Sequence, residues 1–504
     1  MLWALLPLAL LFVHLSGGLS IGSQGRVFTG ADVFDVPDQL QYLAWVRDAG
    51  EHVLVSNQFD LVPDPRLFLH PLFWLSGLAW RAGVSLQLAY LAWRPIAVAI
   101  LLIGFVAYVR RLVGPDPRLR AGVLVLALFF ATPAWAVWGW SGLGSARMRF
   151  GVDVMGLEMF PGAYTSNGLV FGLMPLYLLG VEALLDPARR SPRRSVAWYA
   201  VATGLAGTLV AWLHPWQGLT LLLIVAGLVT WMRPWSEPRP WSRLRVLAFP
   251  ILATVAPFIY YFALSHTHSA WQRVSQPNGY PHLGAWFFVG VIPPLLLILP
   301  GLRGRQLGVQ ERIVRLWPAA ALAVYFLLDR SWFYHALAGL SLPLAILALP
   351  GLRRAGVPAL ALVLLVAAFT IPGSALYVKK LHDEAPQHFL PASEASALSA
   401  LARSRTPGGV LARPPLGTAV PAFSGRSTWV GHPIWTPAYA ARSARADALF
   451  AGRLAPPAAA ALVRESGARF VVADCRASPR LPAALAGVMV SARRFGCATV
   501  YRVR

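Results

Sequence analysis

Residues 89–111 read AYLAWRPIAVAILLIGFVAYVRR, an apolar run that opens beside Arg94 and closes at Arg110 and Arg111. About 20 apolar residues cross a bilayer as an α-helix, so this stretch is typical of a transmembrane span. Similar runs follow along the chain, and arginine clusters separate them. The clusters lie at residues 110–120, 189–194, 233–245, 303–315 and 353–354. Short loops rich in Lys and Arg stay on the cytoplasmic side, so we expect these five loops to face the cytoplasm and the loops between them to face outward.

The composition supports a polytopic membrane protein. Hydrophobic residues make up 57% of the chain and charged residues 13%, mean hydropathy is +0.57, and 20 tryptophans suit the membrane interfaces. In lipid every backbone polar group needs an internal partner, so the expected fold class is an all-α polytopic bundle of eleven helices. The spans are expected near residues 2–18, 89–109, 121–140, 164–184, 197–213, 216–232, 246–264, 284–301, 316–328, 336–350 and 357–377.

Two apolar segments have more than one possible placement relative to the membrane. Residues 2–18 are short enough for a signal peptide, but they have no basic start and no A-x-A cleavage site, so we interpret them as a first span with a cytoplasmic N-terminus. Residues 70–83 would invert every later arginine cluster if they crossed the membrane. We therefore expect them to form an amphipathic helix on the outer surface.

The chain divides into two predicted domains. Residues 1–377 are expected to form the transmembrane domain, with a long first outer loop at 19–88. Residues 378–504 are expected to form an extracytoplasmic α/β domain, and the protein is expected in the cell membrane. Short β-like runs at 409–412, 428–431, 469–473 and 499–503 indicate the sheet. The only two cysteines, Cys475 and Cys497, lie here. An outer location permits a disulfide, and two buried free thiols are the other possibility.

Several function classes lack support. The net charge of +23 follows largely from the topology and a basic C-terminal domain, so we expect no nucleic-acid partner. The sequence has no P-loop, dinucleotide-binding glycine motif, H-E-x-x-H or C-x-x-C. Chemistry therefore depends on carboxylates, histidines and arginines in the outer loops.

The first outer loop has the densest group of such residues, in DVFDVPDQLQYLAW at residues 32–45. Pro37 is typical of the first turn of a helix, and such a helix places Asp38, Gln41 and Tyr42 on one face. A carboxylate, an amide and a phenol would then converge as catalytic and substrate-binding groups. Asp35 is a second candidate base, although it also suits an N-terminal cap, and Asp38 also suits the helix dipole.

Other outer segments supply further candidates. Asp153 and Glu158 in the next outer loop could divide acid and base roles or hold a divalent cation, Mg²⁺ or Mn²⁺, although solvated loop acids are an equal alternative. Arg94 lies just inside a span, where a charge usually has a partner, either an anionic substrate or lipid phosphate. The remaining candidates for substrate binding are His214 in LHPWQG, and Arg330 and His335 in DRSWFYH. An interfacial turn and an Asp329–Arg330 surface pair are the structural alternatives.

These features together resemble the GT-C superfamily of integral-membrane glycosyltransferases, similar to the protein mannosyltransferases and the lipid A aminoarabinose transferases. The resemblance comprises an Asp near the start of a long first loop, a juxtamembrane helix at His70-Pro71, a second span that opens with Arg94, and a soluble C-terminal domain. The tail stretch 417–426, Gly431-His432 and Thr436-Pro437 look like the outer domains of bacterial members. The adjacent acidic pair frequent in the family's first loop is absent, because here the acids are three residues apart.

The resemblance implies transfer of a sugar from a polyprenyl-phosphate-linked donor to a lipid, glycan or protein acceptor at the outer membrane face, among membrane lipids. It makes Asp38 or Asp35 the catalytic carboxylate and Glu158 or Asp153 its acidic partner, and it assigns Arg94 and Arg330 to the phosphate. Two alternatives remain. A non-catalytic scaffold would use the basic C-terminal domain to bind envelope polymers. A lipid or solute transporter would need charges near the bilayer midplane, whereas Arg94 and Glu182 lie near span ends.

Overall fold

The computed structural model describes residues 6–11, 25–142, 165–191, 193–232, 244–276, 282–284, 287–303, 308–328 and 331–504. It divides the chain into two compact units. The first, called the bundle unit, comprises Met1–His14, Arg94–His266 and Ser275–Lys380. The second, called the α/β unit, comprises Leu15–Trp93, Thr267–Val274 and Leu381–Arg504. The first loop and the short segment after residue 266 therefore belong to the same unit as the C-terminal region.

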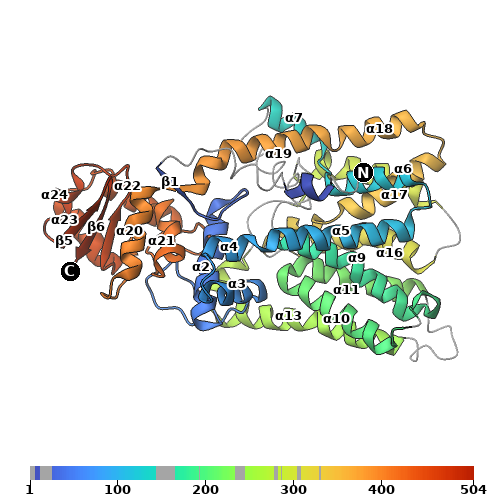
Figure 1. The fold of residues 1–504 in the computed structure, drawn as a ribbon, viewed down its shortest axis with the longest axis horizontal. Helices are drawn as coiled ribbons and strands as arrows, with labels where there is room; N and C mark the ends of the chain where they lie inside the picture. Colours follow the sequence, from blue (N-terminus) through green and yellow to red (C-terminus); the bar gives the residue numbers. More distant parts are fainter. Residues whose placement is uncertain are drawn as a thin grey trace. The chain divides into compact units, whose positions relative to one another are not determined.

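The bundle unit consists of apolar helices (Figure 1). Helices α9 and α10, α10 and α11, α11 and α16, and α6 and α17 pack against each other as pairs. Its main helices are α5 (Trp93–Leu112), α6 (Pro117–Leu128), α7 (Pro133–Ser141), α9 (Thr165–Leu185), α10 (Val196–Leu213), α11 (Pro215–Met232), α13 (Ala248–Thr267), α15 (Ile292–Leu297), α16 (Val309–Leu327), α17 (Ser341–Arg354), α18 (Ala359–Ala368) and α19 (Ile371–Glu384).

The described residues contain six helices that are long and apolar enough to cross a membrane. A seventh span results if α6 and α7, which meet at a bend of 49°, count as one. The 4-residue gap ahead of Pro133 carries that bend, as expected where proline prevents helix continuation. A multi-pass membrane protein is therefore supported, while the count of eleven spans is not confirmed.

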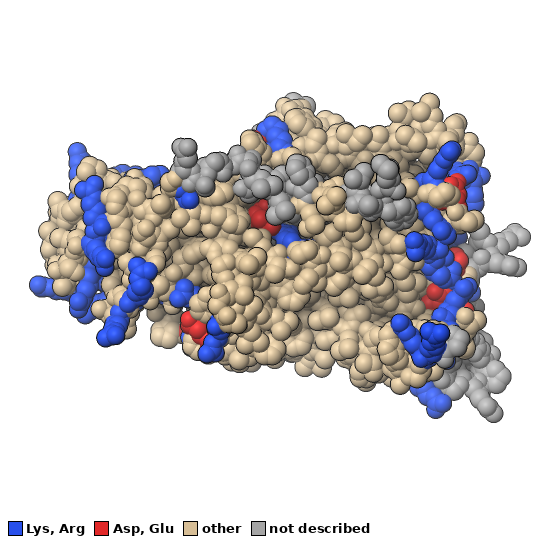
Figure 2. All heavy atoms as spheres, viewed as in Figure 1, with Lys and Arg blue, Asp and Glu red and all other residues tan. Residues whose placement is uncertain are grey.

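The described arginines of the bundle unit's clusters gather at one end of its helices. Arg111 at the end of α5 pairs with Glu182 near the end of α9, and Arg353 at the end of α17 pairs with Asp116 ahead of α6. Arg315 on α16 donates to the carbonyl oxygen of Leu302 at 2.8 Å. Figure 2 shows the blue Lys and Arg spheres concentrated at this end of the unit. The described arginines of loops that are separate in sequence thus form one basic rim.

In the α/β unit, helix α2 (Val36–His52) is the central element. It packs against α3 (Pro71–Arg81) and α21 (Leu416–Ser424), and α4 (Leu86–Leu91) covers part of both α2 and α3. Close approach of α2 and α3 depends on glycine, because a Cβ on Gly50 would meet the carbonyl oxygen of Gly77 at 2.7 Å. Most of α2 is therefore buried, which fixes the direction of the side chains in its first turn.

The predicted surface helix at residues 70–83 is α3. Its 11 residues span about 16 Å, too short to cross a bilayer of about 30 Å. Leu72 and Phe73 are buried toward the unit, while Trp74, Leu75 and Leu78 are exposed. The helix is thus amphipathic, as the sequence predicts.

The C-terminal part of the α/β unit carries a four-stranded mixed sheet in the order β3-β4-β6-β5. Strand β3 runs parallel to β4, whereas β6 is antiparallel to both β4 and β5. The strands are β3 (Val410–Leu411), β4 (Phe470–Ala473), β5 (Met489–Phe495) and β6 (Ala498–Val503), and the helices are α20 (Ala392–Arg403), α21, α22 (Tyr439–Phe450), α23 (Pro456–Ser466) and α24 (Leu481–Leu485). A separate pair, β1 (Arg26–Phe28) and β2 (Phe389–Pro391), joins the first loop to this region in an antiparallel ladder.

Three of the predicted strand runs are confirmed, and the run at 428–431 is wrong. Thr428 forms only an isolated parallel bridge with Val410: the carbonyl oxygen of Ser427 accepts the N–H of Val410 at 3.0 Å, the N–H of Trp429 donates to the carbonyl oxygen of Val410 at 2.9 Å, and the pairing extends no further. Cys475 and Cys497 form a disulfide with Cα atoms 4.8 Å apart. Of the two possibilities left open by the sequence, the structure has the disulfide.

Candidate functional site

Asp38 lies in the first turn of α2 and makes a contact with the distant C-terminal region. Its Oδ1 lies 2.8 Å from Nε2 of His432, 394 residues away in sequence. The His432 side chain is 1% exposed, whereas the Asp38 side chain is 35% exposed. A partly accessible carboxylate is therefore held from one side by a buried imidazole, within a single unit of the chain.

The start of α2 is fixed by Gln39. Its amide nitrogen donates to the carbonyl oxygens of Val33 and Phe34 at 2.8 and 3.1 Å, and its amide oxygen accepts the N–H of Asp32 at 3.1 Å. These bonds satisfy backbone groups that the turn before the helix leaves without partners. Asp38, one position before Gln39, is consequently on a rigid helix start.

Asp35 occupies the N-cap position of α2, as predicted, but its side chain does not make the expected capping bond. The residue adopts a left-handed backbone with φ 52°, and its carbonyl oxygen accepts the N–H groups of Asp38 and Gln39 at 2.9 and 3.3 Å. Backbone geometry thus replaces the side-chain cap. The Asp35 side chain is exposed.

Gln41 and Tyr42 follow Asp38 on the same helix, at the spacing that places all three on one face. Gln41 is buried, and the ring of Tyr42 stacks on Phe73 with centroids 5.4 Å apart. Burial, followed by the charge of Asp38, holds the pKa of Tyr42 well above its usual value. Tyr42 is therefore a neutral phenol that can donate a hydrogen bond.

Other first-loop carboxylates are engaged in contacts that hold the loop together. Asp48 is buried and accepts from His52, Arg66 and the backbone N–H of Ser56 at 2.9, 3.3 and 2.9 Å. Asp60 and Asp64 also hold the first loop in place. Asp60 pairs with Arg442 at 2.8 Å, and Asp64 pairs with His268 at 3.0 Å. These three acids are structural, which distinguishes them from Asp38.

In the bundle unit, the structure brings His214 and His335 together. Their ring centroids lie 5.5 Å apart in an edge-to-face arrangement. Gln217 connects them: its side-chain oxygen lies 2.5 Å from Nδ1 of His214, and its nitrogen donates to the carbonyl oxygens of His335 and Ala338 at 2.6 and 3.1 Å. Sequence reasoning selected both histidines but missed Gln217, which is fully buried and whose position between Trp216 and Gly218 suggested only a turn.

The remaining candidates divide into two groups. Arg94 is buried in the first turn of α5 in the bundle unit. Asp153, Glu158 and Arg330 lie outside the described residues. In the part of the chain that is described, no three His, Cys, Asp or Glu residues form a group suited to a metal ion. The predicted cation pair, Asp153 and Glu158, belongs to the residues that are not described.

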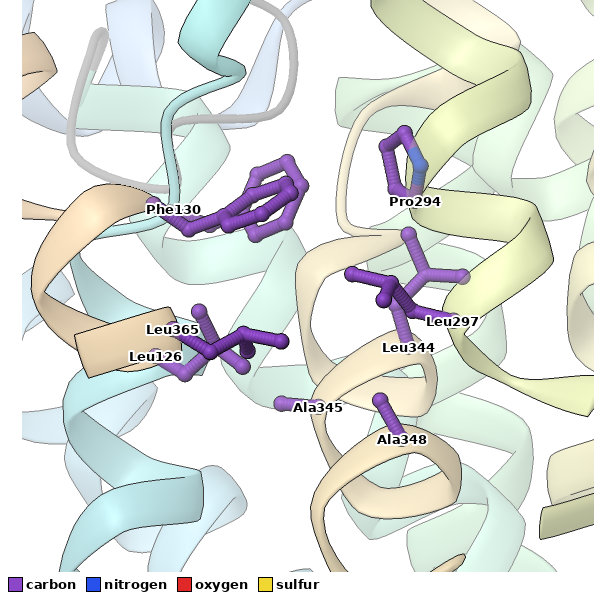
Figure 3. A pocket seen from close by; sticks show the side chains of 9 residues that line it. Leu126, Phe130, Pro294, Leu297, Leu344, Ala345, Ala348 and Leu365 are labelled. Atoms are coloured by element: carbon purple, nitrogen blue, oxygen red, sulfur yellow. The ribbon is translucent and has the colours of Figure 1, made fainter. Parts of the chain in front are cut away.

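A small pocket in the bundle unit lies among α6, α15, α17 and α18 (Figure 3). Its lining is entirely apolar: Leu126, Phe130, Pro294, Leu297, Leu344, Ala345, Ala348, Leu365 and Phe369. The pocket offers no acid, base or phosphate-binding group, so it does not perform the chemistry assigned to the polar residues above.

No protein-family model and no curated protein sequence matches this chain. Among solved structures, the apo Archaeoglobus fulgidus oligosaccharyltransferase has a TM-score of 0.53 at 13% identity, covering 96% of this chain and 72% of that chain. ArnT from Cupriavidus metallidurans in the apo state has a TM-score of 0.50 at 16% identity, covering 99% and 97%.

The mycobacterial arabinofuranosyltransferase AftD has a TM-score of 0.54 at 16% identity. That alignment covers 99% of this chain but 41% of AftD. All three neighbours are GT-C glycosyltransferases. The resemblance seen in the sequence is therefore confirmed at the level of the fold.

Proposed function

We propose that this chain, which has the GT-C fold, is a membrane glycosyltransferase that moves a sugar from a polyprenyl-phosphate-linked donor to an acceptor at the outer face of the membrane. The observation that carries the proposal is the contact between Asp38 and His432. It supplies one oriented, partly exposed carboxylate near the start of the first loop, where the GT-C resemblance expects the catalytic carboxylate. The three structural neighbours, two of them named as sugar transferases, support this reaction class.

The reaction is a displacement at the anomeric carbon of the donor sugar. The acceptor hydroxyl oxygen forms a bond to that carbon, the bond from the carbon to the phosphate oxygen breaks, and polyprenyl phosphate leaves with the electron pair. Asp38 takes the proton from the hydroxyl, because a carboxylate within hydrogen-bond reach can act as a general base. Asp35, exposed one turn earlier, is the second candidate for this role.

Further polar groups bind the sugar and the acceptor. Gln41 and the neutral phenol of Tyr42 provide hydrogen-bond donors on the face of α2 that carries Asp38. In the bundle unit, His214 and His335 form a substrate-binding pair that Gln217 holds in place. Fixed donors of this kind act most strongly where charge develops and water is excluded.

The phosphate of the donor needs positive charge. Arg94 and Arg330 are proposed for it, since a guanidinium matches phosphate oxygens by two parallel hydrogen bonds. Glu158 is proposed as the acidic partner of Asp38, and Asp153 with Glu158 as the ligands of any divalent cation. No step above requires a metal.

The test measures release of polyprenyl phosphate by mass spectrometry. Purified full-length protein in nanodiscs receives a panel of synthetic polyprenyl-phosphate pentoses and hexoses, with lipid and glycan extracts as acceptors. We expect the wild type to release polyprenyl phosphate from at least one donor, and Asp38→Asn to lose at least about 100-fold in kcat. Asp48→Asn, on the same helix but in a structural contact, is the control for damage to α2.

Two results would contradict the proposal. The first is a wild type that is inactive with every donor. The second is an Asp38→Asn variant as active as the wild type, which would move the base to Asp35 or Glu158 or remove carboxylate catalysis. Asp35→Asn and Glu158→Gln distinguish those cases.

A further inference from the structure

We propose that His432 is a positioning residue that orients the Asp38 carboxylate, so that the C-terminal domain takes part in catalysis; this inference rests on the proposed function. The pattern of hydrogen bonds identifies the tautomer of His432. The backbone N–H of Ile434 donates to Nδ1 at 3.1 Å, which requires a lone pair on that nitrogen. In a neutral imidazole the proton is then on Nε2, which lies 2.8 Å from Oδ1 of Asp38. His432 therefore donates to the carboxylate.

The imidazole is held on more than one side. Its ring lies against Phe59 with centroids 5.6 Å apart, and the side chain is 1% exposed. The loop that carries it is closed by hydrogen bonds: Thr436 Oγ1 accepts the N–H of Gly431 at 3.1 Å, and the N–H of Thr436 donates to the carbonyl oxygen of His432 at 3.0 Å. Because the His432 side chain is already immobilised, its hydrogen bond can orient the Asp38 carboxylate without a further loss of His432 side-chain entropy.

A second set of contacts holds the loop that carries His432 to helix α21. Thr418 on α21 donates its hydroxyl to the carbonyl oxygen of Gly431 at 2.8 Å. Helix α21 in turn packs on α2, where Arg47 donates to the carbonyl oxygen of Ala422 at 3.2 Å. Asp38 thus lies on α2, and the loop that carries His432 is held to α21, which packs on α2.

This arrangement assigns different roles to the two carboxylate oxygens. Oδ1 is occupied by His432, which sets the rotamer of Asp38, and Oδ2 is directed to the acceptor hydroxyl. His432 does not touch the reacting atoms in this assignment. Since a base must lie within about 3 Å of the proton that it removes, loss of the orienting bond lowers the rate of the chemical step more than substrate binding.

Two amide substitutions separate positioning from a merely structural role. In His432→Gln the side-chain amide nitrogen reaches the place of Nε2 and still donates to Asp38, but the acceptor for Ile434 is lost. In His432→Asn the amide oxygen takes the place of Nδ1 and still accepts from Ile434, but the donor to Asp38 is lost. The two variants thus remove opposite halves of the contact.

We expect His432→Asn to lower kcat for polyprenyl phosphate release by about 10- to 100-fold with little change in KM, and His432→Gln to retain most of the wild-type rate. The apparent Tm of both variants, measured on the same nanodisc samples, controls for folding. A structural role predicts the reverse order, with His432→Asn active and His432→Gln impaired. An active His432→Asn with an impaired His432→Gln overturns this inference and leaves the proposed function standing. So does full activity of both His432 variants when Asp38→Asn is inactive. A wild type inactive with every donor overturns the proposed function and this inference with it.

Discussion

Nε2 of His268 lies 3.0 Å from Oδ1 of Asp64, which connects the turn between α13 and α14 (Ser269–Val274) to the first loop. The other oxygen of Asp64 accepts the backbone N–H of Asn57 at 2.8 Å. Three residues after His268, Trp271 packs on Phe68 and Trp435 with centroids 4.5 and 5.0 Å apart. The segment at 268–271 therefore contacts two distant parts of the α/β unit, the first loop and the C-terminal region.

This contact should contribute strongly to stability. The Asp64 and His268 side chains are only 16% and 9% exposed. Asp64→Ala leaves a buried N–H and a buried imidazole without their acceptor, so we expect a loss of about 2–3 kcal/mol, read as a lower apparent Tm. A double-mutant cycle with His268→Ala should show coupling between the two changes.

The matched control is the pair Arg445–Glu465, whose side chains are 45% and 58% exposed. Water screens such a pair, so Arg445→Ala and Glu465→Ala should leave the apparent Tm unchanged within error. Equal effects of the Asp64 and Glu465 substitutions would show that the contact with His268 does not stabilise the unit.

His70 makes stability depend on pH. It caps α3, where its Nδ1 accepts the N–H of Phe73 at 3.4 Å, and burial lowers its pKa to about 3. The folded state keeps the imidazole neutral, whereas the unfolded chain binds a proton near the ordinary pKa of about 6.5. The stabilisation is therefore complete above about pH 6.5 and is lost as the pH falls toward 3.

The control for this effect is His70→Asn, because Asn caps a helix without titrating. Apparent Tm values at about pH 7.5 and about pH 5 should differ more for the wild type than for this variant. An equal difference in both proteins would exclude His70 as the titrating group.

The disulfide Cys475–Cys497 closes a segment with a sequence separation of 22 residues. For a loop of that size, removal of the cross-link by Cys475→Ser and Cys497→Ser should cost about 3 kcal/mol. Since the chain has only these two cysteines, protein denatured without reductant should take up no maleimide, and reduced protein should take up two. Two labels without reductant would instead support free thiols.

Six of the predicted spans coincide with helices of the described residues that are long and apolar enough to cross a membrane, because hydropathy is a property of local sequence. It was less able to find helix ends. Helix α16 begins at Val309, whereas the apolar run begins near residue 316. The first turns of α16 carry Arg312 and Arg315, which a helix accommodates but which lower the hydropathy of the segment. Strand β5 was missed for a related reason. It is an edge strand with mostly exposed residues, among them Arg493 and Arg494, so it lacks the alternation typical of a half-buried strand.

The candidate site could be predicted only in its local part. The helix that begins at Val36 and the shared face of Asp38, Gln41 and Tyr42 follow from short-range spacing. The partner of Asp38 does not, because 394 residues separate it from His432 and no periodicity connects them. Tertiary packing brings the two together, through α21 on α2 and Phe59 against His432, and a single sequence contains no signal for those contacts.

Sidedness is the last prediction, and the proposed reaction depends on it. The basic rim of the bundle unit should face the cytoplasm, because loops rich in Lys and Arg are retained there during insertion. The α/β unit, which contains both Asp38 and Arg405, should face outward. In a background of Cys475→Ser and Cys497→Ser, the exposed positions Arg118, Arg193 and Arg405 are replaced one at a time by cysteine and treated with a membrane-impermeant maleimide. We expect Arg405→Cys to react in intact cells, and Arg118→Cys and Arg193→Cys to react only after permeabilisation. The reverse pattern would place Asp38 in the cytosol, where it could not act on an acceptor beyond the membrane.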